Sequence, residues 1–314
     1  MKNFGHLFLI IMKEIKKFPI KFKQVTVITK RRNKIFFKSF YTKNNQINLT
    51  GQENYFNDLA AGLYRTKLGI KDTARAWKFI FKHFFFAKEL FSKIDRASKK
   101  NFFVLDIGCG KGYFRKVLEN NIREREKVIY FGVDLRKDIL KRAIFDTSID
   151  SGAQGDKVTS IYIWHDATKE FPLKSNSFDF IISSQLIKYL EKDKVNYLIS
   201  EIHRLLKKDG ILLLSNGLMF NEKVDLNIAA KRKNRVEYYW TTKELMKIFR
   251  KNKFKKIDIY GGEATLKILM GNIKSSDRVL INKFRKIFPD EIVESIFGFF
   301  YPKLSGVKIF LAKK

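Results

Sequence analysis

Short apolar runs alternate with amphipathic stretches between residues 101 and 260. The runs are rich in Val, Ile and Phe, which predicts buried strands, and the stretches between them have helical spacing. The predicted strands cover residues 102–107, 127–133, 158–164, 178–183, 211–214, 254–260 and 307–311. The predicted helices cover residues 113–121, 136–145, 192–206 and 241–252. Such alternation favours a parallel sheet covered on both faces, so we expect a doubly wound α/β fold with seven mostly parallel strands.

Two local signals refine the expected boundaries. Thr241-x-x-Glu244 is a capping box that should open the helix beginning near residue 241. Lys208-Asp209-Gly210 predicts a turn just before the strand at 211–214. The connection over residues 217–240 is too long for a simple turn, and connections of this length often select substrates.

The flanks lack the strand–helix rhythm of the centre. The chain divides into a basic aromatic extension (1–50), a helical lead-in (51–100), a core (101–260), a helical insertion that is a candidate substrate cap (261–305) and a last strand (306–314). The extension shows no clear rhythm beyond an amphipathic helical opening. That opening fits a helix lying on a membrane surface, and it fits equally a helix packed on the protein's own core.

The formal net charge of +32 is concentrated in the flanks. Residues 1–50 carry +11 and residues 221–314 carry +12, whereas residues 101–220 carry only +3. A basic surface of this size attracts partners that bear phosphate, either nucleic acid or anionic lipid. A lysine-rich composition without any such partner explains the excess as well, and both interpretations stay open.

Cysteine and histidine are scarce. Cys109 stands alone, which excludes an internal disulfide and favours a reducing cytoplasmic setting, and the four histidines are scattered, so we expect no structural metal. No stretch reaches the roughly 18 apolar residues that a membrane-spanning helix needs. We therefore expect a cytoplasmic protein with candidate peripheral membrane contact through the basic N-terminus.

The strongest motif is the run Val104-Leu-Asp-Ile-Gly-Cys-Gly-Lys-Gly112, in which a buried strand ends in an acid and three alternating glycines. Glycines let the backbone turn sharply and approach a ligand closely. The spacing G-x-G-x-G differs from the dinucleotide fingerprint G-x-G-x-x-G, whose third glycine is replaced by Tyr113. The carboxylate of Asp106 would repel a pyrophosphate, but it suits a ligand with a cationic amino group.

This motif resembles the class I S-adenosylmethionine-dependent methyltransferases, and most closely their broad type 11 group. The resemblance implies a Rossmann-like core, S-adenosylmethionine as the cofactor, and contact of the acid and the glycine loop with the methionine part of that cofactor. It also implies that Leu135 flanks the adenine ring and that Asp166, followed by the small Ala167, accepts from the adenine amino group. The candidate loop residues are Asp106, Gly108, Cys109, Gly110 and Gly112.

Three further candidates lie at the carboxyl ends of predicted strands, where open α/β sheets place their ligands. Asp134 ends the second strand, and an acid there can accept hydrogen bonds from both ribose hydroxyls. Ser183 and Gln185 stand at the end of the fourth strand. No acid–base pair is evident, so the catalytic residues are not identified, and His165 is expected to turn away from the site.

Three functions remain open at this point. The first is a methyltransferase for a small molecule, lipid or glycan that works by direct displacement. The second is an RNA methyltransferase that uses the basic flanks, for which no dedicated RNA-binding module is recognised. The third is a non-catalytic protein that keeps the cofactor fold. The absence of an Asn/Asp-Pro-Pro-Tyr/Phe motif after the fourth strand disfavours DNA adenine and protein glutamine methylation.

Overall fold

The computed structural model describes the core of the chain and a few flanking segments. The described residues are 25–31, 34–39, 101–112, 114, 115, 118, 128–149, 158–217, 238, 240–262, 279, 283, 286, 287 and 307–314, with only the backbone described over 25–39. The predicted amphipathic opening, the lead-in at 51–100 and nearly all of the insertion at 261–305 lie outside them. Among the described residues, no helix is long and apolar enough to cross a membrane.

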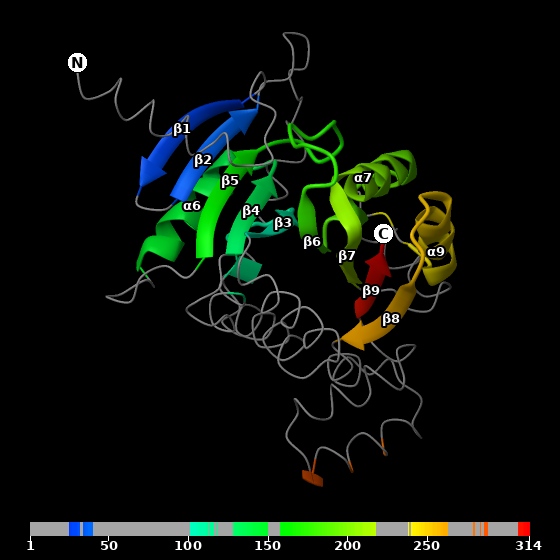
Figure 1. The fold of residues 1–314 in the computed structure, drawn as a ribbon. Helices are drawn as coiled ribbons and strands as arrows, with labels where there is room; N and C mark the ends of the chain where they lie inside the picture. Colours follow the sequence, from blue (N-terminus) through cyan, green and yellow to red (C-terminus); the bar gives the residue numbers. More distant parts are fainter. Residues whose placement is uncertain are drawn as a thin grey trace, which may run out of the picture.

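A single nine-stranded sheet organises the described residues (Figure 1). Its order is β1-β2-β5-β4-β3-β6-β7-β9-β8. The strands are β1 (Val25–Arg31), β2 (Lys34–Ser39), β3 (Phe102–Ile107), β4 (Val128–Asp134), β5 (Val158–Trp164), β6 (Phe178–Ser184), β7 (Leu206–Gly217), β8 (Ile257–Gly262) and β9 (Val307–Lys313). Parallel pairing joins β2, β5, β4, β3, β6 and β7, while β9 lies antiparallel between β7 and β8.

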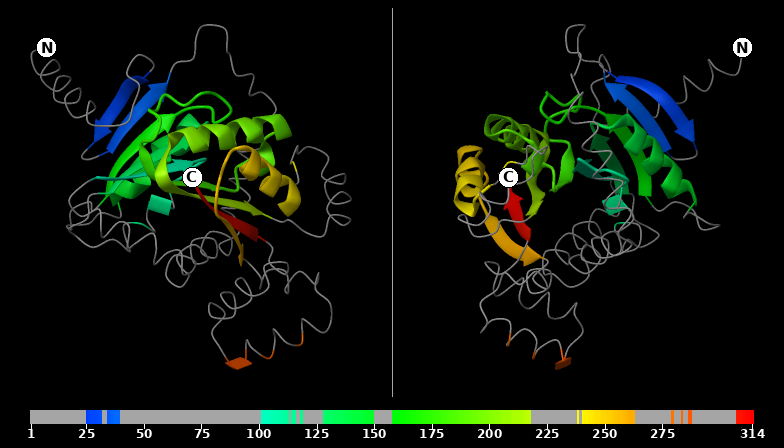
Figure 2. Two further views of the ribbon diagram at one scale, coloured as in Figure 1. Left: turned by 45° about the vertical axis from the view of Figure 1, so that its right-hand side comes forward. Right: turned by 180° about the vertical axis from the view of Figure 1, so that it is seen from behind.

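Helices cover both faces of the sheet, which confirms the predicted doubly wound α/β fold. Helices α7 (Lys192–Leu205) and α9 (Thr242–Lys251) pack on one face, where their apolar side chains join those of all seven core strands in one cluster. Helix α6 (Lys137–Ile149) packs on the other face together with Phe114 and Leu118. Figure 2 shows α7 and α9 side by side on their face. All seven predicted strands are present and form a mostly parallel unit.

Strands β1 and β2 in the N-terminal extension were not predicted from the sequence. The two strands pair antiparallel, and β2 adds parallel to β5, which extends the sheet beyond the seven expected strands. A signal was present, since the β-branched run at 25–29 and the apolar run at 35–37 are separated by a short polar link. The basic and aromatic residues around both runs obscured the period of the pattern.

The turn expected at Lys208–Gly210 lies inside β7 and does not precede it. Strand β7 begins at Leu206, directly after α7, and its register with β6 shifts between the Phe178–Leu206 pair and the Phe180–Ile211 pair. The extra residues form a bulge in which Asp209 adopts a φ of +61°. A bulge accommodates the added residues while both ends of the strand remain paired.

The capping box at the start of α9 is confirmed. The Thr241 hydroxyl accepts a hydrogen bond from the Glu244 backbone N–H at 3.1 Å, and the Glu244 carboxylate accepts one from the Thr241 N–H at 2.9 Å. These reciprocal bonds satisfy two backbone donors that a helix start otherwise leaves unpaired.

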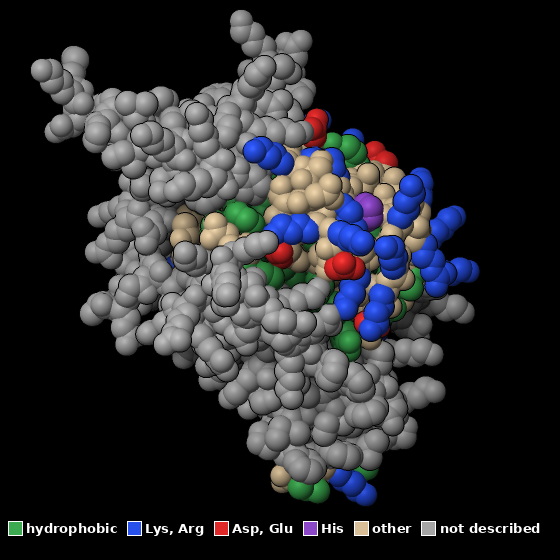
Figure 3. Space-filling model, viewed as in Figure 1, with side chains coloured by type: hydrophobic (Ala, Val, Ile, Leu, Met, Phe, Trp, Pro, Cys, Tyr) green, Lys and Arg blue, Asp and Glu red, His purple; other side chains and the backbone are tan. Residues whose placement is uncertain are grey.

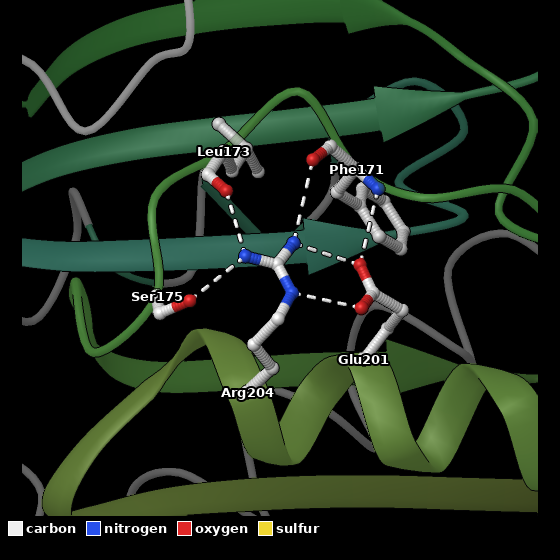
Figure 4. A network of polar contacts seen from close by, with 5 residues as sticks. All are labelled: Phe171, Leu173, Ser175, Glu201 and Arg204. Carbon is white, nitrogen blue, oxygen red and sulfur yellow. Dashed lines mark hydrogen bonds and ion pairs between the residues drawn. The ribbon is translucent and has the colours of Figure 1, made fainter.

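An ion pair on α7 fastens the connection between β5 and β6 to that helix (Figure 4). Arg204 donates to both carboxylate oxygens of Glu201 at 2.8 Å. The same guanidinium donates to the carbonyls of Phe171 and Leu173, and Glu201 accepts from the Phe171 N–H at 3.1 Å. Because Glu201 is buried, loss of the guanidinium would leave a carboxylate and two carbonyls short of donors.

We expect Arg204→Met to lower the free energy of unfolding by about 2–4 kcal/mol, since it keeps an apolar stem but breaks this largely buried ion pair. The measurement is urea denaturation followed by circular dichroism. Lys194→Met on the same helix is the matched control, because its exposed pair with Asp193 spans 3.6 Å and should contribute less than about 1 kcal/mol. Equal losses in the two variants would contradict the structural role of Arg204.

Candidate functional site

The glycine loop connects β3 to the helical residues 114 and 115 and uses a left-handed backbone at every glycine. Gly108, Gly110 and Gly112 have φ values of +75°, +53° and +74°. The N–H groups of Gly108 and Cys109 both donate to the carbonyl of Val133 in the adjacent strand, at 2.8 and 3.0 Å. Residues with a Cβ rarely adopt these φ values, so the G-x-G-x-G pattern fits this tight loop.

Only one of the three loop glycines faces open space. A Cβ on Gly110 would meet no atom within 4 Å, whereas one on Gly112 would lie 3.1 Å from the Tyr162 hydroxyl and one on Gly108 would lie 3.3 Å from Leu186. Gly108 and Gly112 are therefore held against the protein's own side chains. The backbone at Gly110 is the part of the loop that a ligand can approach most closely.

The carboxylate of Asp106 is buried just before this loop, with 4% of the residue exposed. The Tyr130 hydroxyl donates to its Oδ2 at 2.7 Å. Burial raises the pKa of Asp106 to about 7, the hydrogen bond from Tyr130 lowers it, and the nearby Asp134 raises it further. Within the described part of the chain, no Lys or Arg forms an ion pair with Asp106. A desolvated acid of this kind favours a cationic ligand, which would restore its ionised form.

Asp134, at the end of β4, joins the glycine loop to the start of α6. Its Oδ2 accepts from the Gly110 N–H and its Oδ1 accepts from the Arg136 N–H, both at 2.9 Å. Burial raises the pKa of Asp134, while these two backbone hydrogen bonds lower it. Each carboxylate oxygen has a second lone pair, so Asp134 can still accept from ligand hydroxyls.

The predicted residues Leu135, Asp166 and Ala167 directly follow the ends of β4 and β5. Asp134 pairs in register with Trp164, whose indole N–H donates to the Leu135 carbonyl at 2.8 Å. Asp166 follows Trp164 by two residues, and its Oδ1 accepts from the N–H and the hydroxyl of Thr168, both at 2.8 Å. Ala167 packs partly buried against the core. The structure thus brings Leu135, Asp166 and Ala167 to the same edge as the glycine loop.

Ser183 and Gln185 differ in how they meet this edge. Ser183 pairs with Ile107 and Leu214, so its buried side chain lies on the α7 face, opposite to that of Asp106. Its hydroxyl has no hydrogen-bond partner among the described residues. Gln185 has a φ of +60° and donates its backbone N–H to the Ser215 carbonyl at 2.9 Å, which ends β6 beside β7.

The sequence analysis missed Tyr130. Its position two residues before Gly132 on β4 places both on the face of Asp106, and Gly132 is the direct register partner of Asp106. A Cβ at Gly132 would lie 2.9 Å from both the Cys109 sulfur and the Tyr162 ring. The glycine therefore makes room for Cys109 and the two tyrosines beside the acid. The signal in the sequence was the Tyr-x-Gly spacing in a strand next to one that carries an acid.

Neither described histidine is placed as a catalytic base. His165 is buried with its ring 5.0 Å from that of Phe171, and burial lowers the pKa of His165 to about 4. It lies in the core and turns away from the loop, as the alternation with Asp166 predicted. His203 is on α7 against Phe254, far along the chain from the loop. In the described segments no three His, Cys, Asp or Glu side chains group so as to hold a metal ion.

Comparison with known proteins identifies the domain. Residues 105–214 match the family model described as a methyltransferase domain. An uncharacterised protein of Haemophilus influenzae is 25% identical over 177 residues, which cover 51% of this chain and 68% of that protein. An uncharacterised protein of Methanocaldococcus jannaschii is 28% identical over 165 residues, which cover 51% of this chain but only 56% of that protein.

A solved structure shares the fold over most of this chain. Magnesium protoporphyrin IX methyltransferase from Synechocystis, with S-adenosylhomocysteine bound, superposes with a TM-score of 0.50 at 14% identity and covers 84% of this chain and 99% of that one. The family match coincides with the strands and the loop that carry Asp106, the three glycines and Asp134. Residues 105–214 therefore match a methyltransferase domain, and the fold that holds the glycine loop is shared with a methyltransferase that binds S-adenosylhomocysteine.

Proposed function

We propose that this chain methylates a small-molecule, lipid or glycan acceptor by direct displacement, with the cofactor held at the carboxyl ends of β3, β4 and β5. The observation that carries the proposal is the buried Asp106 carboxylate beside the open backbone of Gly110. This pairing fits a ligand that brings an ammonium group into a closely approached loop. S-adenosylmethionine has such a group, and when bound it supplies a methyl already activated by its sulfonium.

Each residue of the edge has a distinct part in this proposal. Asp106 accepts from the amino group, Gly110 lets the backbone pass close to the cofactor, and Asp134 accepts from the ribose hydroxyls. Gly112 lies against Tyr162 and supports the turn of the loop. Around the adenine, Leu135 and Ala167 supply apolar contact and Asp166 supplies an acceptor. Gln185 lies directly after β6, at the end of the site next to β7. Gly108, Cys109 and Ser183 support the shape of the site, because their side chains or Cβ positions are packed inward.

The chain's task in the reaction is alignment. Orienting two reactants and excluding water can lower a barrier by roughly 7–11 kcal/mol. The described edge at β6 and β7 offers hydroxyls, with the Ser184 and Ser215 oxygens 2.9 Å apart, and neither described histidine is placed as a base. This composition supports an acceptor whose transfer needs no proton removal by a core side chain.

The described charges around the glycine loop are mixed. They include the bases Lys111, Arg136 and Lys137 and the acids Asp134, Asp138 and Asp166, with Arg136 and Asp138 paired at 2.6 Å. RNA held for methylation would need an excess of cations along its phosphates at this edge, so the mixed charge gives no specific support to RNA. The side chains of the basic N-terminal extension invoked for membrane contact, and nearly all of the substrate cap at 261–305, lie outside the described residues, so both stay predictions.

We expect cofactor affinity to rise with pH up to about 7, because Asp106 must be ionised to bind the ammonium group. Below that pH the dissociation constant should increase about tenfold per unit. Calorimetry with S-adenosylhomocysteine in buffers of different ionisation enthalpy should show proton release near pH 6. Tyr130→Phe removes a hydrogen bond that lowers the pKa of Asp106, so the profile should move to higher pH.

Two controls bound this prediction. Tyr162→Phe, on the ring that packs edge-on against Tyr130 at 6.1 Å, should leave the profile in place because the Tyr130–Asp106 bond remains. Relative to Asp106→Asn, the cofactor-free wild type should lose stability as pH rises from about 4 to 7, since the raised pKa of Asp106 makes the folded state bind its proton more tightly than the unfolded state does. This comparison cancels the opposite contribution of His165, whose pKa burial lowers to about 4. An unchanged profile in Asp106→Asn would contradict the role of Asp106.

Gly110→Val should weaken binding of S-adenosylhomocysteine by about 100-fold or more, because the side chain would fill the open space beside the loop. Its φ of +53° adds backbone strain of roughly 1–2 kcal/mol, so a modest loss of thermal stability is also expected. Asp209→Val at a φ of +61° in the β7 bulge is the matched control for strain and should keep affinity. Equal affinity in the wild type and Gly110→Val would contradict a cofactor approach at Gly110.

The acceptor class is tested by transfer of a radiolabelled methyl group into fractionated cell extract. We expect label in the small-molecule, lipid or glycan fractions and its loss in Asp106→Asn. Label in the RNA fraction would overturn the proposed acceptor in favour of the RNA alternative. Cofactor binding without transfer into any fraction would favour the non-catalytic alternative.

A further inference from the structure

A dense group of cations lies at the end of the sheet opposite the glycine loop. Its members are Arg250, Lys251, Lys253, Lys255, Lys256, Lys313 and Lys314, which we call the cationic ridge. Five of them fall within residues 250–256, where no acid occurs, and those five are exposed. Figure 3 shows Lys and Arg side chains crowded on the side of the molecule where α7, α9 and the end of β9 lie in Figure 1.

The backbone explains why the cations point outward together. Helix α9 ends at Lys251, and Lys253, with a φ of +63°, donates its N–H to the Arg250 carbonyl at 3.0 Å. Phe254 then turns inward with 4% exposure and packs on Phe249 at 5.6 Å. With the only aromatic residue of this turn in the core, the neighbouring lysines project into solvent.

Backbone hydrogen bonds join the turn to the end of β9. The Lys255 N–H donates to the Lys313 carbonyl and the Lys313 N–H donates to the Lys256 carbonyl, both at 2.9 Å. Lys314 donates its ammonium to the Leu206 carbonyl at 2.7 Å, beside the start of β7. Burial lowers the pKa of His203, and the cations Lys314, Lys253 and Lys255 lower it further. The cations of the α9–β8 turn and of the end of β9 are therefore close enough together to lower the pKa of the same histidine.

Few acids offset the ridge. Asp258 pairs with Lys256 at 3.5 Å, and Asp179 pairs with the adjoining Lys207 at 2.7 Å. By contrast, α7 carries acids and bases in nearly equal number along its length. The α9–β8 turn and the end of β9 therefore carry a higher density of positive charge than α7 does.

We propose that the cationic ridge docks the phosphate backbone of a nucleic acid, separately from the methyl-transfer site. Closely spaced exposed cations release condensed counterions from such a backbone, which favours binding. The ridge lies at the amino ends of the parallel strands, so a strand length of roughly 20 Å separates it from the glycine loop. The nucleic acid held there is an anchoring partner, and the acceptor of the methyl group stays at the opposite end.

The chemistry of the ridge favours nucleic acid over a membrane. Stable membrane association normally adds apolar side chains to a basic patch. The exposed large apolar residues of the described chain are Tyr197, Val279 and Ile287, and none belongs to the ridge. No exposed aromatic ring is available there for base stacking, so binding should be independent of sequence.

The test measures binding of a fluorescent single-stranded RNA of about 20 nucleotides between about 50 and 200 mM salt. In the triple variant Lys251→Gln, Lys253→Gln, Lys255→Gln, the slope of log K against log salt should shrink by about 2, and affinity at low salt should fall at least about tenfold. The matched control Lys141→Gln, Arg142→Gln, Lys243→Gln removes three exposed cations from α6 and the start of α9 and should keep both values.

Other outcomes would overturn the proposal. These are the absence of RNA binding at low salt, equal losses in the two triple variants, or unchanged RNA affinity in the ridge variant. Binding to phosphatidylserine vesicles that the ridge variant alone loses, with RNA affinity intact, would assign the ridge to a membrane. Affinity for S-adenosylhomocysteine should be equal in both variants, which confirms their folding and separates this inference from the proposed methyl transfer.

Discussion

The site depends on the buried carboxylate of Asp106, which forms no ion pair with a Lys or Arg among the described residues. Asp106 ends a central strand, where both sheet neighbours and the glycine loop remove it from water, and the Tyr130 hydroxyl is the side-chain donor bonded to it. Burying an acid without a cation costs free energy, and the raised pKa of Asp106 expresses that cost. In the proposed function, a ligand with an ammonium group recovers part of this free energy, which favours binding of the cofactor.

Two glycines, Gly132 and Gly110, determine the packing around Asp106. Gly132 lies beside the acid in the register of β4, and its missing Cβ lets the Cys109 sulfur and the Tyr130 and Tyr162 rings fill the space. Gly110 has no neighbour at its own Cβ position, although its N–H is held by Asp134. Gly132 therefore allows close packing beside Asp106, while Gly110 leaves the space next to the loop backbone free. Both effects come from the same residue type in different surroundings.

The sequence predicted much of this arrangement and missed specific parts of it. Apolar runs of Val, Ile and Phe identified all seven core strands, because strands buried on both faces contain few polar interruptions. The capping box at Thr241 was predictable because it depends on local residues alone. Strands β1 and β2 were missed because lysines interrupt their apolar pattern, and the β7 bulge was mistaken for a preceding turn because register depends on the partner strand.

The site shows the same division between local and non-local information. The acid and the glycines follow one another in the chain, so their spacing revealed them, whereas Tyr130 reaches Asp106 across 24 positions and only strand pairing brings them together. Ser183 shows that two residues at the end of one strand can face opposite sides of the sheet. Its neighbour Ile107 faces the α7 cluster, and alternation carries the Ser183 hydroxyl to that face and away from Asp106.

The topology also separates two kinds of surface. Parallel strands collect the glycine loop, Asp134 and Asp166 at their carboxyl ends, while the antiparallel β9 returns Lys313 and Lys314 to the amino ends beside the α9–β8 turn. The described residues of the first edge carry mixed charges, whereas cations dominate the second. The exposed charges of the two edges lie more than about 10 Å apart, so they are largely screened from one another at moderate salt. Each edge can therefore bind its partner by its own chemistry, and a change at one need not alter the other.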